Sequence, residues 1–177
     1  MTAPPPLSVP IIVTALMGAE DFAKADAMRR QHFLPERNQI PAHISLFHHL
    51  PPARLAELTR LMAQLTRGEM APAARLAGVM SLGRGVAYRI ESPELMALRE
   101  RIAEVFAADL IAQDQPPPRL HITVQNKVAP RVAAVLHSQL NAEFRPRRLV
   151  IAGIAAWHYL GGPWQLAHRA LFTRSRA

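Results

Sequence analysis

Two four-residue stretches decide the fold of this chain: His-Ile-Ser-Leu at residues 43–46 and His-Ile-Thr-Val at residues 121–124. Each follows a proline-bearing loop and precedes a helix-like segment that opens with a proline, Pro52 in the first case and Pro130 in the second. The two prolines stand at the same offset along the chain as the two histidines. Such a duplication predicts two lobes related by a pseudo-two-fold axis, with a cleft between them.

The segments around the two motifs follow the same order: strand, helix, proline-bearing loop, motif strand, proline-started helix and hairpin. The strand-then-helix pattern over residues 86–109 matches the one over residues 9–33. Turn residues at 83–85 and 161–163 predict hairpins, which require antiparallel pairs. We therefore expect an α+β fold, with antiparallel sheets lining the cleft and helices on the outside.

We expect residues 1–177 to form a single domain. Its lobes are predicted over about residues 9–92 and 93–173, with some exchange of strands between them possible. A chain of 177 residues with 50% hydrophobic and 19% charged residues fits one soluble domain. The absence of cysteine excludes disulfides, thiol catalysis and thiolate metal sites.

No apolar run approaches the ~20 residues of a membrane-spanning helix, and no basic stretch followed by an apolar core marks a secretory signal. We therefore expect a cytoplasmic protein with no membrane partner. The sequence does not determine the oligomeric state, although a monomer is favoured.

The formal net charge is +8, and only Lys24 and Lys127 are lysines, so nearly all the basic residues are arginine. Arginine suits phosphate recognition, and a basic surface favours anionic partners such as nucleotides or RNA. A coding bias toward arginine, alanine and proline explains the same composition. The clusters at residues 145–148 and 174–176 fit either contacts to an RNA backbone or a solvated basic surface.

The motifs place chemically useful side chains on one face of each strand. Residues i and i+2 of a strand point the same way, so His43 lies beside Ser45 and His121 beside Thr123. Across a two-fold cleft, one imidazole can take a proton from an attacking oxygen while the other protonates the leaving oxygen. The hydroxyls can donate hydrogen bonds to the non-bridging phosphate oxygens. This chemistry needs no metal and no cofactor.

The motifs at 43–46 and 121–124, with the order of elements around them, resemble the 2H phosphoesterases, and among these the bacterial 2'-5' RNA ligase-like branch. The resemblance extends from about residue 9 to residue 173. Members of the family open or hydrolyse 2',3'-cyclic phosphates, act on ADP-ribose cyclic phosphate, or join and split 2'-5'-linked RNA. The resemblance implies a two-lobed duplicated fold, His43 and His121 as the acid/base pair, and Ser45 and Thr123 as phosphate-binding hydroxyls. Serine in the first motif replaces the more usual threonine.

Four further residues are candidates for substrate binding: Phe47, Arg119, Gln125 and Tyr159, the last of which lies beside Trp157. Strand alternation places Phe47 on the face of the first motif, and Arg119 and Gln125 on the face of the second. Phe47 can stack on a base or belong to the core, and Arg119 can grip a phosphate or lie at a solvated rim. Trp157 and Tyr159 share one face of the last hairpin and form either the floor of a base pocket or ordinary packing.

The predicted function is that of a metal-independent phosphoesterase acting on 2',3'-cyclic phosphates or on 2'-5'-linked RNA or nucleotides by two-histidine acid/base catalysis. The pseudo-symmetry makes the roles of the two histidines interchangeable, although we favour His121 as the base and His43 as the acid. The alternative is a non-catalytic module that binds RNA or nucleotides in the same cleft. The basic charge fits that alternative equally well, but a binding module has no need of a matched acid/base pair.

Overall fold

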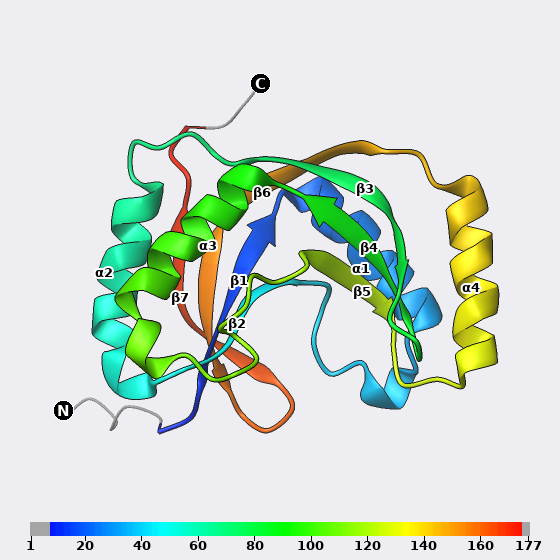
Figure 1. Cartoon of the computed structure of the whole chain (residues 1–177), viewed down its shortest axis with the longest axis horizontal. Coiled ribbons are helices and arrows are strands. Elements are labelled where there is room, and N and C mark those ends of the chain that lie inside the picture. The colour runs from blue at the N-terminus through cyan, green and yellow to red at the C-terminus, as the bar shows by residue number, and fades with distance from the viewer. Residues whose placement is uncertain (1–7, 175–177) are drawn as a thin grey trace.

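The computed structural model describes residues 8–174, which contain four α-helices and seven strands (Figure 1). In chain order these elements are β1 (Ile11–Met17), α1 (Ala19–His32), β2 (Ile44–Leu50), α2 (Leu55–Thr66), β3 (Ala73–Ser81), β4 (Val86–Glu91), α3 (Pro93–Val105), β5 (His121–Gln125), α4 (Pro130–Glu143), β6 (Arg147–Tyr159) and β7 (Trp164–Leu171). Short 3-10 turns lie at Pro35–Arg37, Pro52–Arg54 and Ala107–Asp109.

Helices α3 and α4 begin at the prolines that the sequence signals mark, whereas Pro52 begins a 3-10 turn and α2 itself begins only at Leu55. The Ser92 side chain caps α3 by accepting a hydrogen bond of 3.1 Å from the backbone N–H of Leu95, and Pro93 occupies the first helical position. Pro130 likewise occupies the first helical position of α4, where no side chain caps the helix. On α2, residues at helical spacing, including Leu58, Met62 and Leu65, are buried and so fix the face that packs on the sheet.

The strand order shows the duplication directly. The sheet runs β2-β1-β6-β3-β4-β5, with β7 also paired to β6, and every pair is antiparallel. Exchanging β1 with β4, β2 with β5 and β3 with β6 leaves this order unchanged, so a pseudo-two-fold axis passes between β6 and β3. The predicted α+β class and the antiparallel pairing are confirmed.

The two structural units meet at the β3–β4 turn, at residues 82–85, rather than at residues 92 and 93. The first unit is β1-α1-β2-α2-β3 and the second is β4-α3-β5-α4-β6. Gly83 takes a φ of +76° in the turn, a conformation that favours glycine. Since β3 pairs with β4 and β6 returns to β1, each half of the sheet takes strands from both units.

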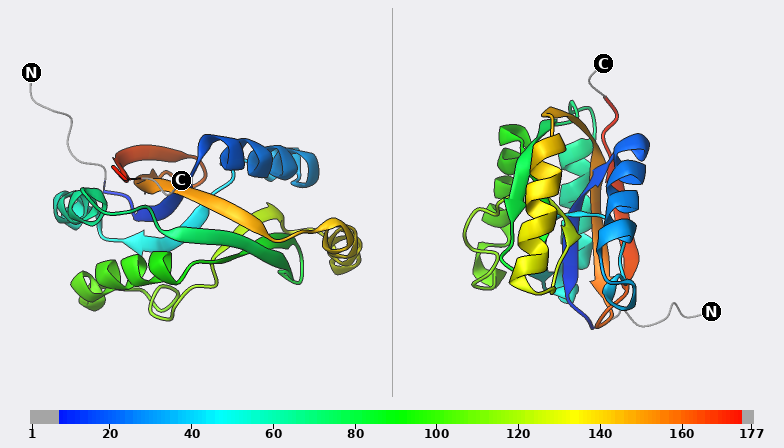
Figure 2. Two further views of the ribbon diagram at one scale, coloured as in Figure 1. Left: turned by 90° about the horizontal axis from the view of Figure 1, so that it is seen from above. Right: turned by 90° about the vertical axis from the view of Figure 1, so that its right-hand side faces the viewer.

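The helices lie on the outside of two lobes (Figure 2). We call the half that contains β2, β1, β6 and β7 lobe 1, and α2 and α3 pack there over a core that includes Ile11, Leu46 and Ile102. Lobe 2 contains β5, β4 and β3 and is covered by α4 and α1. Helix α1 follows a strand of lobe 1 but packs against β5, so it joins the two lobes.

Both motif strands contain an irregularity at the same position. Val13 pairs with Phe47 and the next residue of β1 pairs with Ser45, so Leu46 is an extra residue in β2. In the same way, neighbouring residues of β4 pair with Gln125 and Thr123, which leaves Val124 extra in β5. Each β-bulge therefore comes directly after the motif hydroxyl and ends the strict alternation of faces there.

Candidate active site

The two motif histidines are held by the same backbone contact in both halves. Nδ1 of His43 lies 2.8 Å from the carbonyl oxygen of Pro41, and Nδ1 of His121 lies 2.6 Å from that of Arg119. A carbonyl oxygen only accepts hydrogen bonds, so Nδ1 carries the proton in each ring. The neutral rings therefore keep an unprotonated Nε2, the nitrogen that can accept or, once protonated, donate a proton.

The motif hydroxyls lie on the same sheet face as the histidines. Ser45 is opposite Thr14 of β1, and Thr123 is opposite Ala87 of β4. Both hydroxyl residues are half-buried, as are the two histidines. β2 and β5 approach each other, and the charge of His121 acts on His43, so the structure brings the two predicted pairs into one site.

The environment of His43 favours the neutral imidazole. Burial is the main cause that lowers the pKa of His43 from 6.5 to about 4, and nearby positive charge on Arg29, His121 and His48 acts in the same direction. The hydrogen bond to Pro41 opposes the shift but does not cancel it. Near neutral pH, the His43 ring is therefore neutral, with Nε2 unprotonated.

An aromatic pocket of about 450 Å³ opens beside His43 on the lobe 1 side. The His43 and Trp164 ring centroids are 4.7 Å apart, and the Trp157 and Trp164 centroids are 6.2 Å apart. The indole N–H of Trp157 donates a hydrogen bond of 2.8 Å to the Thr14 hydroxyl, which fixes the ring. The pocket presents flat apolar surface next to a titrating group, as a site for a heteroaromatic ring requires.

Trp164 is a pocket residue that the sequence reasoning missed. It begins β7, and its position beside His43 depends on how the β6–β7 hairpin folds back across the sheet. Gly162 in the hairpin turn approaches Gln39 so closely that a Cβ there would lie 2.2 Å from the Gln39 side-chain oxygen. The hairpin turn therefore lies beside the loop that precedes the first motif.

Arg29 on α1 is a second residue that the sequence reasoning missed as part of the site. It is 3% exposed, and its Nη1 donates a hydrogen bond of 3.0 Å to the carbonyl oxygen of Thr123 in the second motif. Its Nε donates to the Asn38 side chain at 2.7 Å and to the carbonyl oxygen of Ile40 at 3.1 Å, in the loop before the first motif. The guanidinium also lies 4.0 Å from the Phe33 ring centroid. Arg29 therefore ties one motif to the other.

Asp114 has a related role on the loop before the second motif. Its carboxylate is buried and accepts backbone hydrogen bonds of 2.9 Å from His48 and from His49, and it lies 2.8 Å from Nδ1 of His48. Burial alone would raise the pKa of Asp114, but the hydrogen bonds from His48 and His49 outweigh it and lower the pKa. The loop is thereby attached to β2.

Two of the substrate-binding predictions are wrong, and the β-bulges explain why. Phe47 is fully buried beneath the guanidinium of Arg99, which lies 4.5 Å from its ring centroid, so it belongs to the core and cannot stack on a base. Gln125 is 6% exposed and lines a different pocket beside α4. The extra residue in each strand turns both side chains away from the face of the histidines.

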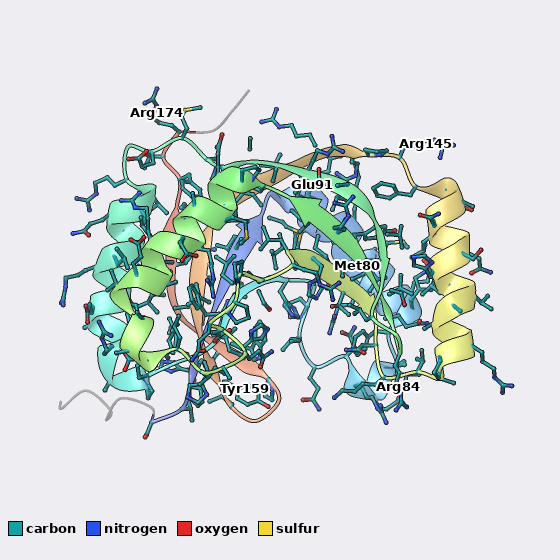
Figure 3. All side chains as sticks on the ribbon, in the orientation of Figure 1. Met80, Arg84, Glu91, Arg145, Tyr159 and Arg174 are labelled. Atoms are coloured by element: carbon teal, nitrogen blue, oxygen red, sulfur yellow. The ribbon has the colours of Figure 1, made fainter. Side chains whose placement is uncertain are left out.

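The other two candidates lie at the edge of the site. Arg119 is exposed, and its carbonyl oxygen holds His121. Tyr159 is 40% exposed, is the last residue of β6 (Figure 3) and pairs in register with Trp164, but it does not line the aromatic pocket. Contact of either side chain with a substrate stays a prediction.

Along residues 8–174, no helix has both the length and the apolar character needed to cross a membrane. Over the same residues, no group of three or more histidine, aspartate and glutamate side chains is placed to hold a metal ion.

Comparison with known proteins supports the interpretation of the motifs. A family model described as the 2'-5' RNA ligase superfamily matches residues 18–163. No curated protein matches the chain by sequence.

Solved structures share the fold at low sequence identity. TT0787 of Thermus thermophilus has a TM-score of 0.64 and 17% identity, over 93% of this chain and 98% of its own. E. coli LigT complexed with 3'-AMP has a TM-score of 0.61 and 15% identity, over 94% and 99%. A structure described as a phosphoesterase has a TM-score of 0.57 and 15% identity, over 95% and 100%.

Proposed function

Because the chain belongs to the 2'-5' RNA ligase superfamily, we propose that it is a phosphoesterase acting on 2',3'-cyclic phosphates or 2'-5'-linked nucleotides by two-histidine acid/base catalysis. The observation that carries this proposal is the matched pair of imidazoles. Each donates Nδ1–H to the carbonyl two residues earlier and so keeps Nε2 for proton transfer.

In the hydrolysis of a cyclic phosphate, Nε2 of one histidine takes a proton from water as the water oxygen bonds to phosphorus. The bond from phosphorus to one ribose oxygen breaks, and the protonated Nε2 of the other histidine delivers a proton to that oxygen. The hydroxyls of Ser45 and Thr123 donate hydrogen bonds to the non-bridging oxygens, where negative charge gathers in the transition state. After turnover the two histidines have exchanged protonation states and re-equilibrate with solvent.

The lowered pKa of His43 supports His43 as the base and His121 as the acid in this direction. With a pKa of about 4, His43 in the free enzyme is neutral near pH 7 and can accept the proton from water. This assignment is the opposite of the one favoured from the sequence. Under it, kcat/KM stays high as the pH falls from about 7 toward 5, because His43 remains unprotonated. A loss of kcat/KM over that range would contradict the assignment, because the base would then become protonated between pH 7 and pH 5.

The aromatic pocket supports binding of the nucleoside part of the substrate. E. coli LigT has been crystallised with 3'-AMP, and carried to this chain this suggests that a base occupies the space between His43, Trp157 and Trp164. Stacking on an aromatic side chain contributes about 1–3 kcal/mol per base and does not depend strongly on base identity.

A product assay tests the proposal. Wild-type protein is incubated, with EDTA present, with 2',3'-cyclic nucleotides, ADP-ribose cyclic phosphate and 2'-5' dinucleotides. We expect turnover of at least one of these, and its reduction by roughly 10²–10⁴-fold in His43→Ala and in His121→Ala. His49→Ala, which removes an exposed histidine of β2, is the matched control and keeps its activity.

Near-normal activity in either motif variant contradicts the two-histidine mechanism. Salt-dependent RNA binding by the wild-type protein without any turnover would identify a binding module instead.

A further inference from the structure

A second pocket, of about 300 Å³, lies in lobe 2 on the sheet face opposite to the histidines. Tyr88 of β4 pairs in register with Ile122 of β5, and both line this pocket. The next pair along the two strands is Arg89 with His121, and successive residues of a strand point to opposite faces. The sheet therefore separates this pocket, which we call the α1–α4 pocket, from the histidine site.

Helices α1 and α4 form the sides of the α1–α4 pocket, and the sheet forms its floor. Most of the lining is apolar or aromatic, and it includes Met28, Leu76, Tyr88, Ile122, Leu140 and Phe144. The Tyr88 and Phe144 rings stack with their centroids 6.1 Å apart, and Ile122 is fully buried beneath them. A pocket with this volume and lining suits one flat apolar ring system.

The hydroxyl of Tyr88 adds a hydrogen-bond donor to this lining. Among residues 8–174, no group forms a hydrogen bond with it. Burial raises the pKa of Tyr88, so the phenol keeps its proton and can donate it to an acceptor. The charges of Arg147 and Glu143 act on this hydroxyl, and both residues line the pocket, so the hydroxyl lies toward the charged rim.

The rim carries more positive than negative side chains: Lys24, Arg145 and Arg147 against Asp21 and Glu143. Asp21 is already occupied, because it accepts hydrogen bonds from Arg147 and, at 2.8 Å, from the backbone N–H of Val150. Lys24 forms an exposed ion pair with Glu20. The rim therefore favours a ligand that brings a negative charge.

Arg145 is the cation of the rim that is left for such a ligand. Its Nη1 donates hydrogen bonds to the carbonyl oxygens of Phe144, at 2.8 Å, and of Ala142, at 3.5 Å. Within the part of the chain that the structure describes, no carboxylate forms an ion pair with it. Figure 3 shows Arg145 directly beyond the end of α4. A guanidinium has five N–H donors, so donors remain for the two oxygens of a carboxylate.

We propose that the α1–α4 pocket is a second ligand site, which binds a small aromatic carboxylate. The aromatic ring lies against Tyr88 and Phe144, and the carboxylate accepts hydrogen bonds from Arg145 and from the Tyr88 hydroxyl. This inference does not depend on the proposed function, because no group of the histidine site takes part in the binding.

The α1–α4 pocket lies directly behind the second motif. Ile122 stands between His121 and Thr123, and Met28 precedes Arg29, whose Nη1 donates the hydrogen bond of 3.0 Å to the Thr123 carbonyl oxygen. A ligand bound against Ile122 and Met28 therefore contacts both elements that position this motif, β5 and α1.

The test titrates the full-length protein with 2-naphthoate and with its neutral analogue 2-naphthamide, which has the same ring system without the charge. Backbone amide shifts, measured by NMR on isotope-labelled protein, give both the position and the affinity of each compound. For 2-naphthoate we expect saturable binding with a Kd of about 1 mM or lower. The largest shifts are expected at the amides around Lys24, Tyr88 and Ile122.

Substitutions at the rim test the charge and the donor separately. Arg145→Gln raises the Kd of 2-naphthoate about tenfold and leaves that of 2-naphthamide unchanged. Tyr88→Phe keeps the ring and raises the Kd about threefold. Glu143→Gln removes an opposing charge and lowers the Kd. Arg60→Gln, which changes an exposed arginine on the outer helix α2, is the matched control and keeps the wild-type Kd.

The aromatic pocket beside His43 is the competing site for the same probe. Trp164→Ala alters that pocket, so the Kd and the shifts in lobe 2 stay unchanged if the proposal is correct. Shifts confined to residues around His43 and Trp164 overturn the proposal, as does a titration that shows no saturation up to about 10 mM. Equal Kd values for 2-naphthoate in the wild-type protein and in Arg145→Gln also overturn it.

Discussion

Replacing His43 by glutamine tests whether burial keeps this imidazole neutral. The pKa of His43 is lowered from 6.5 to about 4, so the unfolded chain binds more protons than the folded protein between these two values. The free energy of unfolding therefore rises with pH across this window. Below about pH 4 the contribution of the neutral His43 ring to the free energy of unfolding is lost, and above about pH 6.5 this contribution is complete.

The two pKa values give the size of the effect. At pH 5 the folded protein holds His43 largely neutral, whereas the unfolded chain is almost fully protonated at this residue. Linkage then makes the wild-type protein about 2 kcal/mol less stable at pH 5 than at pH 7 through this group alone. In His43→Gln this part of the pH dependence disappears, while the contributions of the carboxylates remain.

Urea unfolding at about pH 5 and pH 7, followed by circular dichroism, measures the difference. His49→Gln removes an exposed imidazole from the same strand and serves as the control. If wild type and His43→Gln lose the same stability between the two pH values, the burial argument is refuted, and with it the support for His43 as the base.

Three further predictions follow from the contacts around the site. Arg29→Met leaves the carbonyl oxygens of Ile40 and Thr123 without their buried donor. We therefore expect a loss of about 3 kcal/mol in unfolding free energy, measured by urea titration, and a fall in kcat, both partly restored in Arg29→Lys. Trp164→Ala removes the aromatic ring that contacts His43, so we expect the pKa of His43, measured by NMR, to rise toward 6.5. We also expect KM for a cyclic nucleotide to increase about tenfold. An unchanged KM would show that the nucleobase binds elsewhere. Asp114→Asn removes a carboxylate whose pKa is lowered, so it reduces stability at pH 7 and weakens the loss of stability as the pH falls through about 4; equal acid sensitivity in the wild-type protein and the variant would contradict this.

Local patterns predicted the parts of the site that depend on neighbouring residues in one strand. The i, i+2 rule placed His43 with Ser45 and His121 with Thr123, and the structure has each pair on one face. The α+β class and the duplication were also predicted, because repeated order and turn residues are features of the chain itself. The same i, i+2 rule gave a wrong prediction two residues after Ser45, at Phe47, which it placed on the face of His43.

The failures have a common physical cause. A β-bulge is set by the register with the partner strand, and nothing in residues 43–50 alone marks Leu46 as the extra residue. Trp164 and Arg29 reach the site only through a hairpin and a helix that pack across the sheet. The sequence shows which side chains these residues carry, but it does not show their partners, which are distant along the chain. Arg29 and Thr123, for example, are 94 residues apart.

The pairing of β6 with β1, and of β3 with both β4 and β6, has a consequence for how the acid and the base are kept together. Each half of the sheet needs a strand from the other unit. Two separate copies of one unit would therefore have to exchange strands, as in a domain-swapped dimer. Such a dimer would lose its site on dilution. In this chain the two units are covalently linked, so the exchange of strands is intramolecular. The covalent link sets the effective concentration of one imidazole near the other. Dilution therefore does not separate the proton donor from the proton acceptor.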